Sequence, residues 1–217
     1  MNARTIRHSL SLLALAALLP ACARVEDGPK VSESRSVGEF SSIDLRGAGT
    51  LDVLVGQPHS VTVEASADTL KDLETRVQGD RLVIDARDES FWLRNGTYRV
   101  RITVPRLDSL VVSGATDASI HGFSGGNTKI VVSGAGDLEA SGTVDSFDAV
   151  TNGAANLNLS QLTATDVRVV VNGAGNAKVQ ASGRLDATVN GVGNIEYRGH
   201  PTDLKTAVNG VGSIKPH

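Results

Sequence analysis

Short runs in which apolar and polar residues alternate recur along the C-terminal half of the chain. Residues 167–171 (VRVVV) and 185–189 (LDATV) are examples. Alternation with a period of two over four to six residues is typical of β-strands that bury one face. Because no segment from 108 to 217 shows the 3.6-residue period of an amphipathic helix, this half is predicted to consist of strands.

A small turn follows each run, and these turns return at a nearly constant spacing. The turn motif is Ser or Asn, then Gly, then Ala or Val. Its glycines stand 20, 19, 20, 18 and 19 residues apart, at Gly114, Gly134, Gly153, Gly173, Gly191 and Gly210. A repeat of this length predicts a solenoid, in which each coil packs on its neighbours. An earlier copy at Gly47 indicates that a first coil begins near Ser41.

The repeats, aligned on their glycines, form columns that predict the core and the outer face. Three mostly apolar columns are predicted to face inward: Thr128, Phe147, Val167, Leu185 and Leu204; Ile130, Ala149, Val169, Ala187 and Thr206; Val132, Thr151, Val171, Val189 and Val208. An outward column alternates in charge, as parallel in-register stacking favours: Lys129, Asp148, Arg168, Asp186 and Lys205. The turn column predicts a structural ladder of stacked amides at Asn152, Asn172, Asn190 and Asn209.

The handedness follows from a pattern that the repeats lack. A left-handed hexapeptide helix needs an apolar residue at every sixth position, and the chain does not have one there. We therefore predict an all-β fold built on a single-stranded right-handed parallel β-solenoid, with about 19 residues per coil.

Residues 54–107 break this period. They hold several strand-like runs, a hairpin signal at Gln78-Gly79-Asp80 and a short stretch at 67–70 that favours one helical turn. We predict an N-terminal antiparallel β meander with the first coil over residues 37–107, and β-solenoid repeats over residues 108–217. The meander is expected to cap the first end of the solenoid.

The N-terminus is predicted to be an export signal rather than part of the fold. Residues 1–22 combine a basic start with an apolar stretch that is too short to span a bilayer. The sequence LPAC at 19–22 matches a lipobox, which predicts cleavage before Cys22 and lipidation of its thiol. The alternative is plain cleavage after Ala23, at an Ala-x-Ala site.

The stretch that follows is polar and is predicted to be a flexible tether, over residues 23–36. Ala23, where an Asp would favour retention in the inner membrane, indicates an outer-membrane lipoprotein. The predicted localisation is therefore the cell envelope, on the periplasmic or surface face, with the membrane as a partner through the lipid anchor.

The composition excludes several classes of protein. Aromatic residues make up 3% of the chain, so small and β-branched aliphatic residues must fill the core. A net charge of -3 without a basic stripe argues against a nucleic-acid partner. The single cysteine precludes an internal disulfide, and the five histidines do not stand at metal-ligand spacings. No metal or other cofactor is predicted.

Two features are candidates for ligand contact. Phe91 and the only Trp of the chain, Trp92, could stack on a sugar or anchor a partner; alternatively they fold back over the end of the solenoid. A corner column after the glycines could bind calcium or a sugar, but we favour a role in satisfying backbone groups of the turns. This column is Asp117, Asp137, Asn156, Asn176 and Asn194. Since no acid and base converge, no catalytic residue and no enzyme activity are predicted.

The order of these features resembles a known family. A short strand with Gly-Ala-Gly at 47–49 precedes strands that end in VPRL at 104–107, and repeated Ser/Asn-Gly-Ala-Gly-Asp/Asn units follow. Residues 40–215 resemble the bacterial domain of unknown function called the auto-transporter adhesin head, or GIN domain. The resemblance implies an adhesin-like, non-enzymatic binding module. A glycan or another envelope protein is predicted as its partner. Two other functions stay open, a structural or signalling accessory of an envelope protein and a small carbohydrate-active enzyme.

Overall fold

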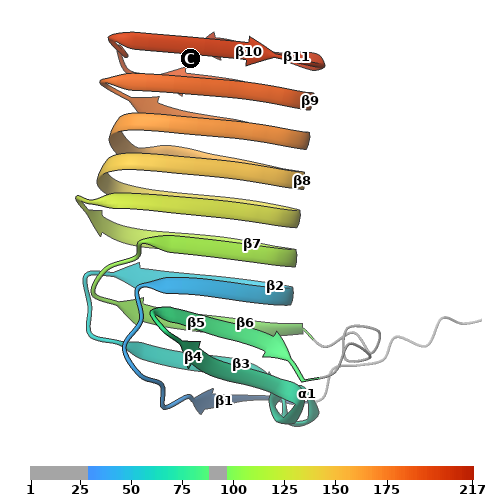
Figure 1. Cartoon of the computed structure of the whole chain (residues 1–217). Helices are drawn as coiled ribbons and strands as arrows, with labels where there is room; N and C mark the ends of the chain where they lie inside the picture. Colours follow the sequence, from blue (N-terminus) through green and yellow to red (C-terminus); the bar gives the residue numbers. More distant parts are fainter. Residues whose placement is uncertain (1–28, 88–96) are drawn as a thin grey trace, which may run out of the picture.

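The computed structural model describes residues 29–87 and 97–217, and the fold is all-β (Figure 1). One mixed sheet contains eleven strands. They are β1 (Lys30–Ser34), β2 (Ser42–Val55), β3 (Ser60–Ser66), β4 (Leu73–Gln78), β5 (Arg81–Ala86), β6 (Thr97–Val104), β7 (Ser109–Ser124), β8 (Asn127–Ala181), β9 (Arg184–Arg198), β10 (Asp203–Val208) and β11 (Val211–Pro216). Within the described ranges, no helix is long and apolar enough to cross a membrane.

The C-terminal repeats stack one above another as parallel strands (Figure 1). β7 pairs with β8 in a register that sets Gly114 opposite Gly134, and β8 pairs with β9 with Gly173 opposite Gly191. β10 and β11 both pair in parallel with β9. These are the pairs that alignment of the repeats on their glycines predicts.

Thin layers of aliphatic side chains form the core between these strands. Ile130, Ala149, Val169 and Ala187 are each at most 1% exposed, and Phe147 is the largest of the fully buried side chains. Backbone pairing between layers spaced about 4.8 Å apart leaves room for such small residues to pack without large aromatic rings.

The last repeat departs from the predicted core. Leu204 and Val208, which the columns place inward, are 46% and 42% exposed, and Thr206 between them is exposed as well. Their counterparts one layer below, Leu185 and Val189, are fully buried. The prediction of burial is wrong for this repeat because no further layer of the described chain packs over it.

The N-terminal half continues the stack in part. β2 pairs in parallel with β7, with Gly47 opposite Gly114, and its other neighbours β5 and β6 are also parallel to it. Within residues 37–107, the antiparallel pairs are β3 with β6 and β4 with β5. The predicted antiparallel meander is therefore correct for these two pairs and wrong for β5 and β6 against β2. Alternation predicts that a segment is a strand but does not specify its partner.

Two local predictions in this half are confirmed. The hairpin between β4 and β5 turns at Gly79, whose φ of 65° suits glycine. The helical turn is α1 (Ala67–Asp72), where the Ser66 hydroxyl accepts a hydrogen bond from the Thr69 amide at 3.2 Å. This is an N-cap, which satisfies one of the free donors at the start of the helix.

The predicted tether is wrong for its second part. Residues 30–34 form β1, which pairs antiparallel with β3 from Lys30 opposite Ser66 to Ser34 opposite Thr62. The guanidinium of Arg35 also donates to the carbonyl oxygen of Leu70 at 2.9 Å. All five residues of β1 are exposed, so backbone pairing holds this strand and no apolar pattern marks it in the sequence.

Candidate functional site

A shallow groove of about 590 Å³ runs along the stack. It crosses the strand segments that follow the glycine turns of the last five repeats, from Gly134 to Gly210. We call it the polar groove. Its polar lining is Asp137, Glu139, Asn156, Asn158, Asn176, Lys178, Asn194, Glu196 and Lys215. Because side chains two residues apart on a strand share a face, these residues form two parallel columns along the stack.

The first column is a hydrogen-bonded spine. The Oδ1 atom of Asn156 accepts both the backbone amide and the Nδ2 group of Asn176, each at 3.2 Å. The Oδ1 atom of Asn176 likewise accepts both groups of Asn194, at 3.2 and 3.3 Å. At the start of the column, Asn156 Nδ2 donates to Asp137 at 2.9 Å. The side-chain oxygens of this column thus accept hydrogen bonds from the next repeat, including its backbone amide, as the predicted turn-stabilising role requires. Each Asn keeps one side-chain N–H free to donate to a ligand.

The second column is more varied and carries the charges of the groove. Asn158 Nδ2 donates to Glu139 at 3.3 Å, and Lys215 pairs with Glu196 at 3.4 Å. Lys178 stands opposite Glu196 in the register of β8 and β9 but forms no ion pair with any described residue. Lys178 is exposed and lines the middle of the groove, so its ammonium offers three N–H donors to a ligand there.

A second ladder lies at the glycine turns. Each Nδ2 group donates to the Oδ1 atom of the preceding repeat, from Asn172 to Asn152 at 3.0 Å, from Asn190 to Asn172 at 2.7 Å and from Asn209 to Asn190 at 2.9 Å. These side chains lie outside the polar groove and their amides serve one another, which suits a structural role.

Three members of the charged column before the turns are paired along the stack. Arg168 donates to Asp148 at 3.0 Å, and Lys129 lies 3.9 Å from the same carboxylate. These exposed pairs contribute little stability individually, and they balance the charge of this face.

Among residues 29–87 and 97–217, no group of three or more His, Cys, Asp or Glu side chains is placed to hold a metal ion. Clear pKa shifts occur in the N-terminal half, where Asp44 and then Asp85 raise the pKa of Arg46, and burial raises the pKa of Tyr98. The Tyr98 hydroxyl donates to the backbone carbonyl oxygen of Arg46, so it belongs to the packing of β6 against β2. The Arg46 guanidinium instead pairs with Asp85 of β5 at 3.1 Å.

Three of the residues predicted for function lie outside the described residues, namely Cys22, Phe91 and Trp92. The corner column Asp137, Asn156, Asn176 and Asn194 was identified from the sequence and lines the polar groove. Sequence reasoning missed the second column. Its signal was available, since four of its five members stand two residues after a member of the first column.

A repeat protein of stacked parallel strands with a polar groove on one face is the class that this geometry defines. The family model described as "Putative auto-transporter adhesin, head GIN domain" matches residues 39–201. The chain belongs to this family.

Solved structures give further comparisons. A protein titled "putative adhesin" from Bacteroides fragilis NCTC 9343 is 22% identical, with a TM-score of 0.69 over 88% of this chain and 98% of that one. This likeness shows the fold. A "putative adhesin" from Parabacteroides distasonis ATCC 8503 has 17% identity and a TM-score of 0.46, covering 88% of this chain and 98% of its own. A "putative lipid binding protein" from the same strain has 17% identity and a TM-score of 0.44, covering 88% and 97%. No curated protein matches the chain.

Proposed function

We propose that this protein is a cell-envelope lipoprotein that acts as a non-enzymatic binding or adhesion module, and that the polar groove binds an extended glycan. The scaffold is a right-handed β-solenoid with coils of about 19 residues. Membership of the adhesin-head family supports a binding role, and the groove is the single observation that carries the choice of surface.

The chemistry of the groove supports a ligand rich in hydroxyl groups. Amide, carboxylate and ammonium groups all line it, so the groove as a whole offers both donors and acceptors. The layers repeat about every 4.8 Å, which is close to the length of one sugar ring in an extended chain. A glycan lying along the stack would therefore meet one layer of polar side chains at each successive ring. The low net charge of the lining is less suited to a strongly charged polymer.

The groove is tested by replacing the Lys178 ammonium, which lines the groove and forms no ion pair with a described residue. A glycan array identifies a ligand for the full chain, and calorimetric titration then compares Lys178→Ala with wild type. We expect affinity to fall roughly ten- to a hundredfold, because a hydrogen bond to a charged group contributes about 1.5–3 kcal/mol. The matched control is Lys129→Ala, an exposed lysine that does not line the groove. Equal losses in both variants would assign the effect to net charge and contradict the proposal.

The same assay compares the groove with the aromatic pair predicted from the sequence. If Trp92 contacts the ligand, Trp92→Ala abolishes binding and leaves the melting temperature unchanged. If Trp92 packs on the body, the variant loses stability instead. Loss of binding in Trp92→Ala but not in Lys178→Ala would move the ligand site away from the groove. Capture of one dominant envelope protein after cross-linking, with no glycan bound, would favour the accessory role.

The lipid anchor is a separate part of the proposal and has its own measurement. We expect the membrane-extracted mature chain to begin at Cys22 and to carry the added mass of two or three acyl chains, since one chain alone anchors weakly. Cys22→Ser removes the acceptor thiol and should abolish the added mass in an intact-mass spectrum. An unmodified wild-type chain that starts at Arg24 would instead show cleavage at the Ala-x-Ala site.

A further inference from the structure

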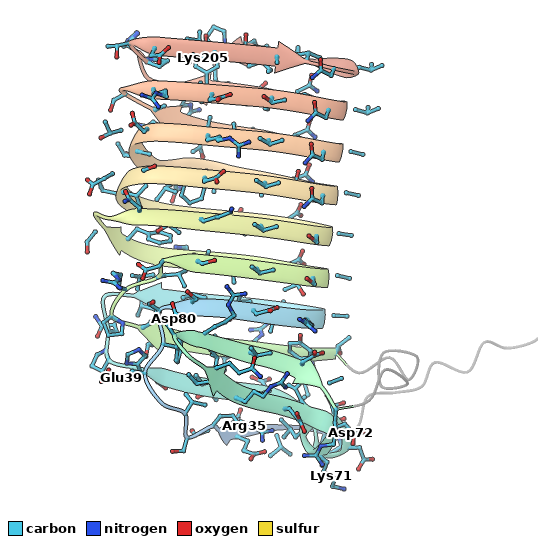
Figure 2. All side chains as sticks on the ribbon, viewed as in Figure 1. Arg35, Glu39, Lys71, Asp72, Asp80 and Lys205 are labelled. Carbon is cyan, nitrogen blue, oxygen red and sulfur yellow. The ribbon has the colours of Figure 1, made fainter. Side chains whose placement is uncertain are left out.

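The strand β10, in the last layer of the stack, leaves one edge of the sheet open. In the described part of the chain β10 pairs with β9 alone, and it lies at the end of the strand order. Figure 2 shows Lys205 of this strand in the last layer, at the opposite end of the molecule from Arg35 and Lys71. Leu204 and Val208 are 46% and 42% exposed here. An exposed edge with apolar side chains is a template for another strand.

The direction of the backbone groups along this edge follows from two hydrogen bonds. The amides of Asp203 and Asn209 donate to the carbonyl oxygens of Gly183 and Val189, at 3.1 and 2.7 Å. Backbone groups alternate in direction along a strand, so the odd-numbered residues of β10 face β9. The N–H and C=O groups of Leu204, Thr206 and Val208 therefore point toward the open edge.

The edge at the other end of the sheet differs. β1 is exposed along its whole length and carries Lys30 and Glu33, the latter paired with Arg35 at 3.3 Å. Charged residues on an edge strand oppose further pairing. β10 also carries two charged residues, Asp203 and Lys205, but it sets two exposed apolar side chains on one face, on either side of Thr206, whereas β1 exposes one, Val31 at 49%. The larger apolar surface favours the C-terminal edge as an interface.

We propose that two copies of this chain associate end to end through antiparallel pairing of their β10 strands, about a twofold axis at Thr206. This register pairs Thr206 with itself and Leu204 with Val208 of the second copy. The backbone N–H and C=O groups of Leu204, Thr206 and Val208 point toward the open edge. In this register each of these residues exchanges two backbone hydrogen bonds with the residue opposite it in the second copy. A twofold interface must be self-complementary, and the sequence Leu204-Lys205-Thr206-Ala207-Val208 meets this condition.

Charge and packing agree with the same register. Lys205 lies opposite Ala207 and Asp203 opposite Asn209, so no like charges face one another. The exposed ends of the two cores meet, because Leu204, Thr206 and Val208 continue the columns of the buried Leu185, Ala187 and Val189. The association removes this apolar surface from water.

A disulfide test reads the register directly in the full chain. The Cα atoms of a hydrogen-bonded antiparallel pair lie about 5.5 Å apart, within disulfide range. Thr206→Cys should therefore yield a cross-linked dimer on mild oxidation of cell membranes, read on a non-reducing gel. The matched control is Lys205→Cys, whose two copies lie diagonally, about 7–8 Å apart, too far for a bond. Cross-linking of both variants alike, or of neither, overturns the register.

A pair of charge variants tests the association without a new covalent bond. Leu204→Lys with Val208→Glu places opposite charges across the interface, whereas Leu204→Glu with Val208→Glu places like charges there. Sedimentation equilibrium of the full chain in one density-matched detergent should give a dimer for wild type and the first variant and a monomer for the second. A wild-type monomer at every soluble concentration, or equal masses for the two variants, overturns the proposal.

Discussion

Replacing Gly173 by alanine is expected to lower the free energy of unfolding by roughly 4 kcal/mol or more, the range of severe core lesions. Gly173 has a φ of 131°, and a Cβ atom placed on it would overlap the carbonyl oxygen of Gly153 in the layer below. The glycines at the turns stack directly on one another, so the overlapping atom is backbone that is itself fixed by pairing. Neither the strain nor the overlap can be relieved without separating two layers.

Alanine substitutions at three other glycines separate the two causes of this destabilisation, the strained φ angle and the overlap of the Cβ atom with backbone. A Cβ at Gly175 meets the carbonyl oxygen of Ala155, but Gly175 has no positive φ, so Gly175→Ala reports the overlap. Gly125 has a φ of 92° and no atom within 4 Å, so Gly125→Ala reports strain of roughly 1–3 kcal/mol. Gly38→Ala has neither and should be close to neutral.

Urea unfolding followed by circular dichroism measures all four variants. If Gly173→Ala is no worse than Gly125→Ala, stacking of the backbone does not constrain the turn. Amide hydrogen exchange should show the loss concentrated in the layers next to residue 173, because each repeat contacts only its neighbours.

The register of the C-terminal half could be predicted because the same physical constraint recurs at every turn. Each glycine lies where backbone passes over backbone, so the glycine spacing gives the strand pairing. The N-terminal half has this marker at Gly47 and Gly49, and the sequence from 57 to 107 does not repeat it at the period of the coils. Its strands alternate clearly, yet the partners of β5 and β6 depend on how β2 extends the stack, which is a long-range property. β1 has no apolar pattern at all, since pairing with β3 involves its backbone.

The candidate site was predictable to a similar degree. The Asp and Asn residues of the first column are visible as a repeat, and their carboxamide oxygens do bond to backbone amides of the next layer. The second column varies among Glu, Asn and Lys, so it does not stand out as a repeated residue type. Its members become a site only when stacking brings them to one face. The exposure of Leu204 and Val208 could not be predicted either, because the same column is buried one layer below.

Removal of a buried, unpaired hydroxyl group is expected to raise the free energy of unfolding, in contrast to the glycine substitutions. Thr151 is 1% exposed, and its Oγ1 atom has no hydrogen-bond partner among the described residues. Valines occupy its column one repeat before and one repeat after, at Val132 and Val171. Burial of an unpaired hydroxyl costs roughly 1–3 kcal/mol. Thr151→Val keeps the shape of the side chain and removes the hydroxyl, so we expect it to stabilise the fold by about 1–2 kcal/mol.

Thr128→Val is the control that makes this result specific. Thr128 is also buried, but its hydroxyl donates to the carbonyl oxygen of Leu107 at 2.9 Å. Replacing threonine by valine at position 128 removes this hydrogen bond and leaves the Leu107 carbonyl oxygen without it, so the variant should destabilise the fold by about 1 kcal/mol. Since 1 kcal/mol corresponds to about 2–4 °C in a chain of this size, thermal unfolding resolves the two opposite shifts. If both variants shift the melting temperature in the same direction, valine packing rather than the unpaired hydroxyl governs this column.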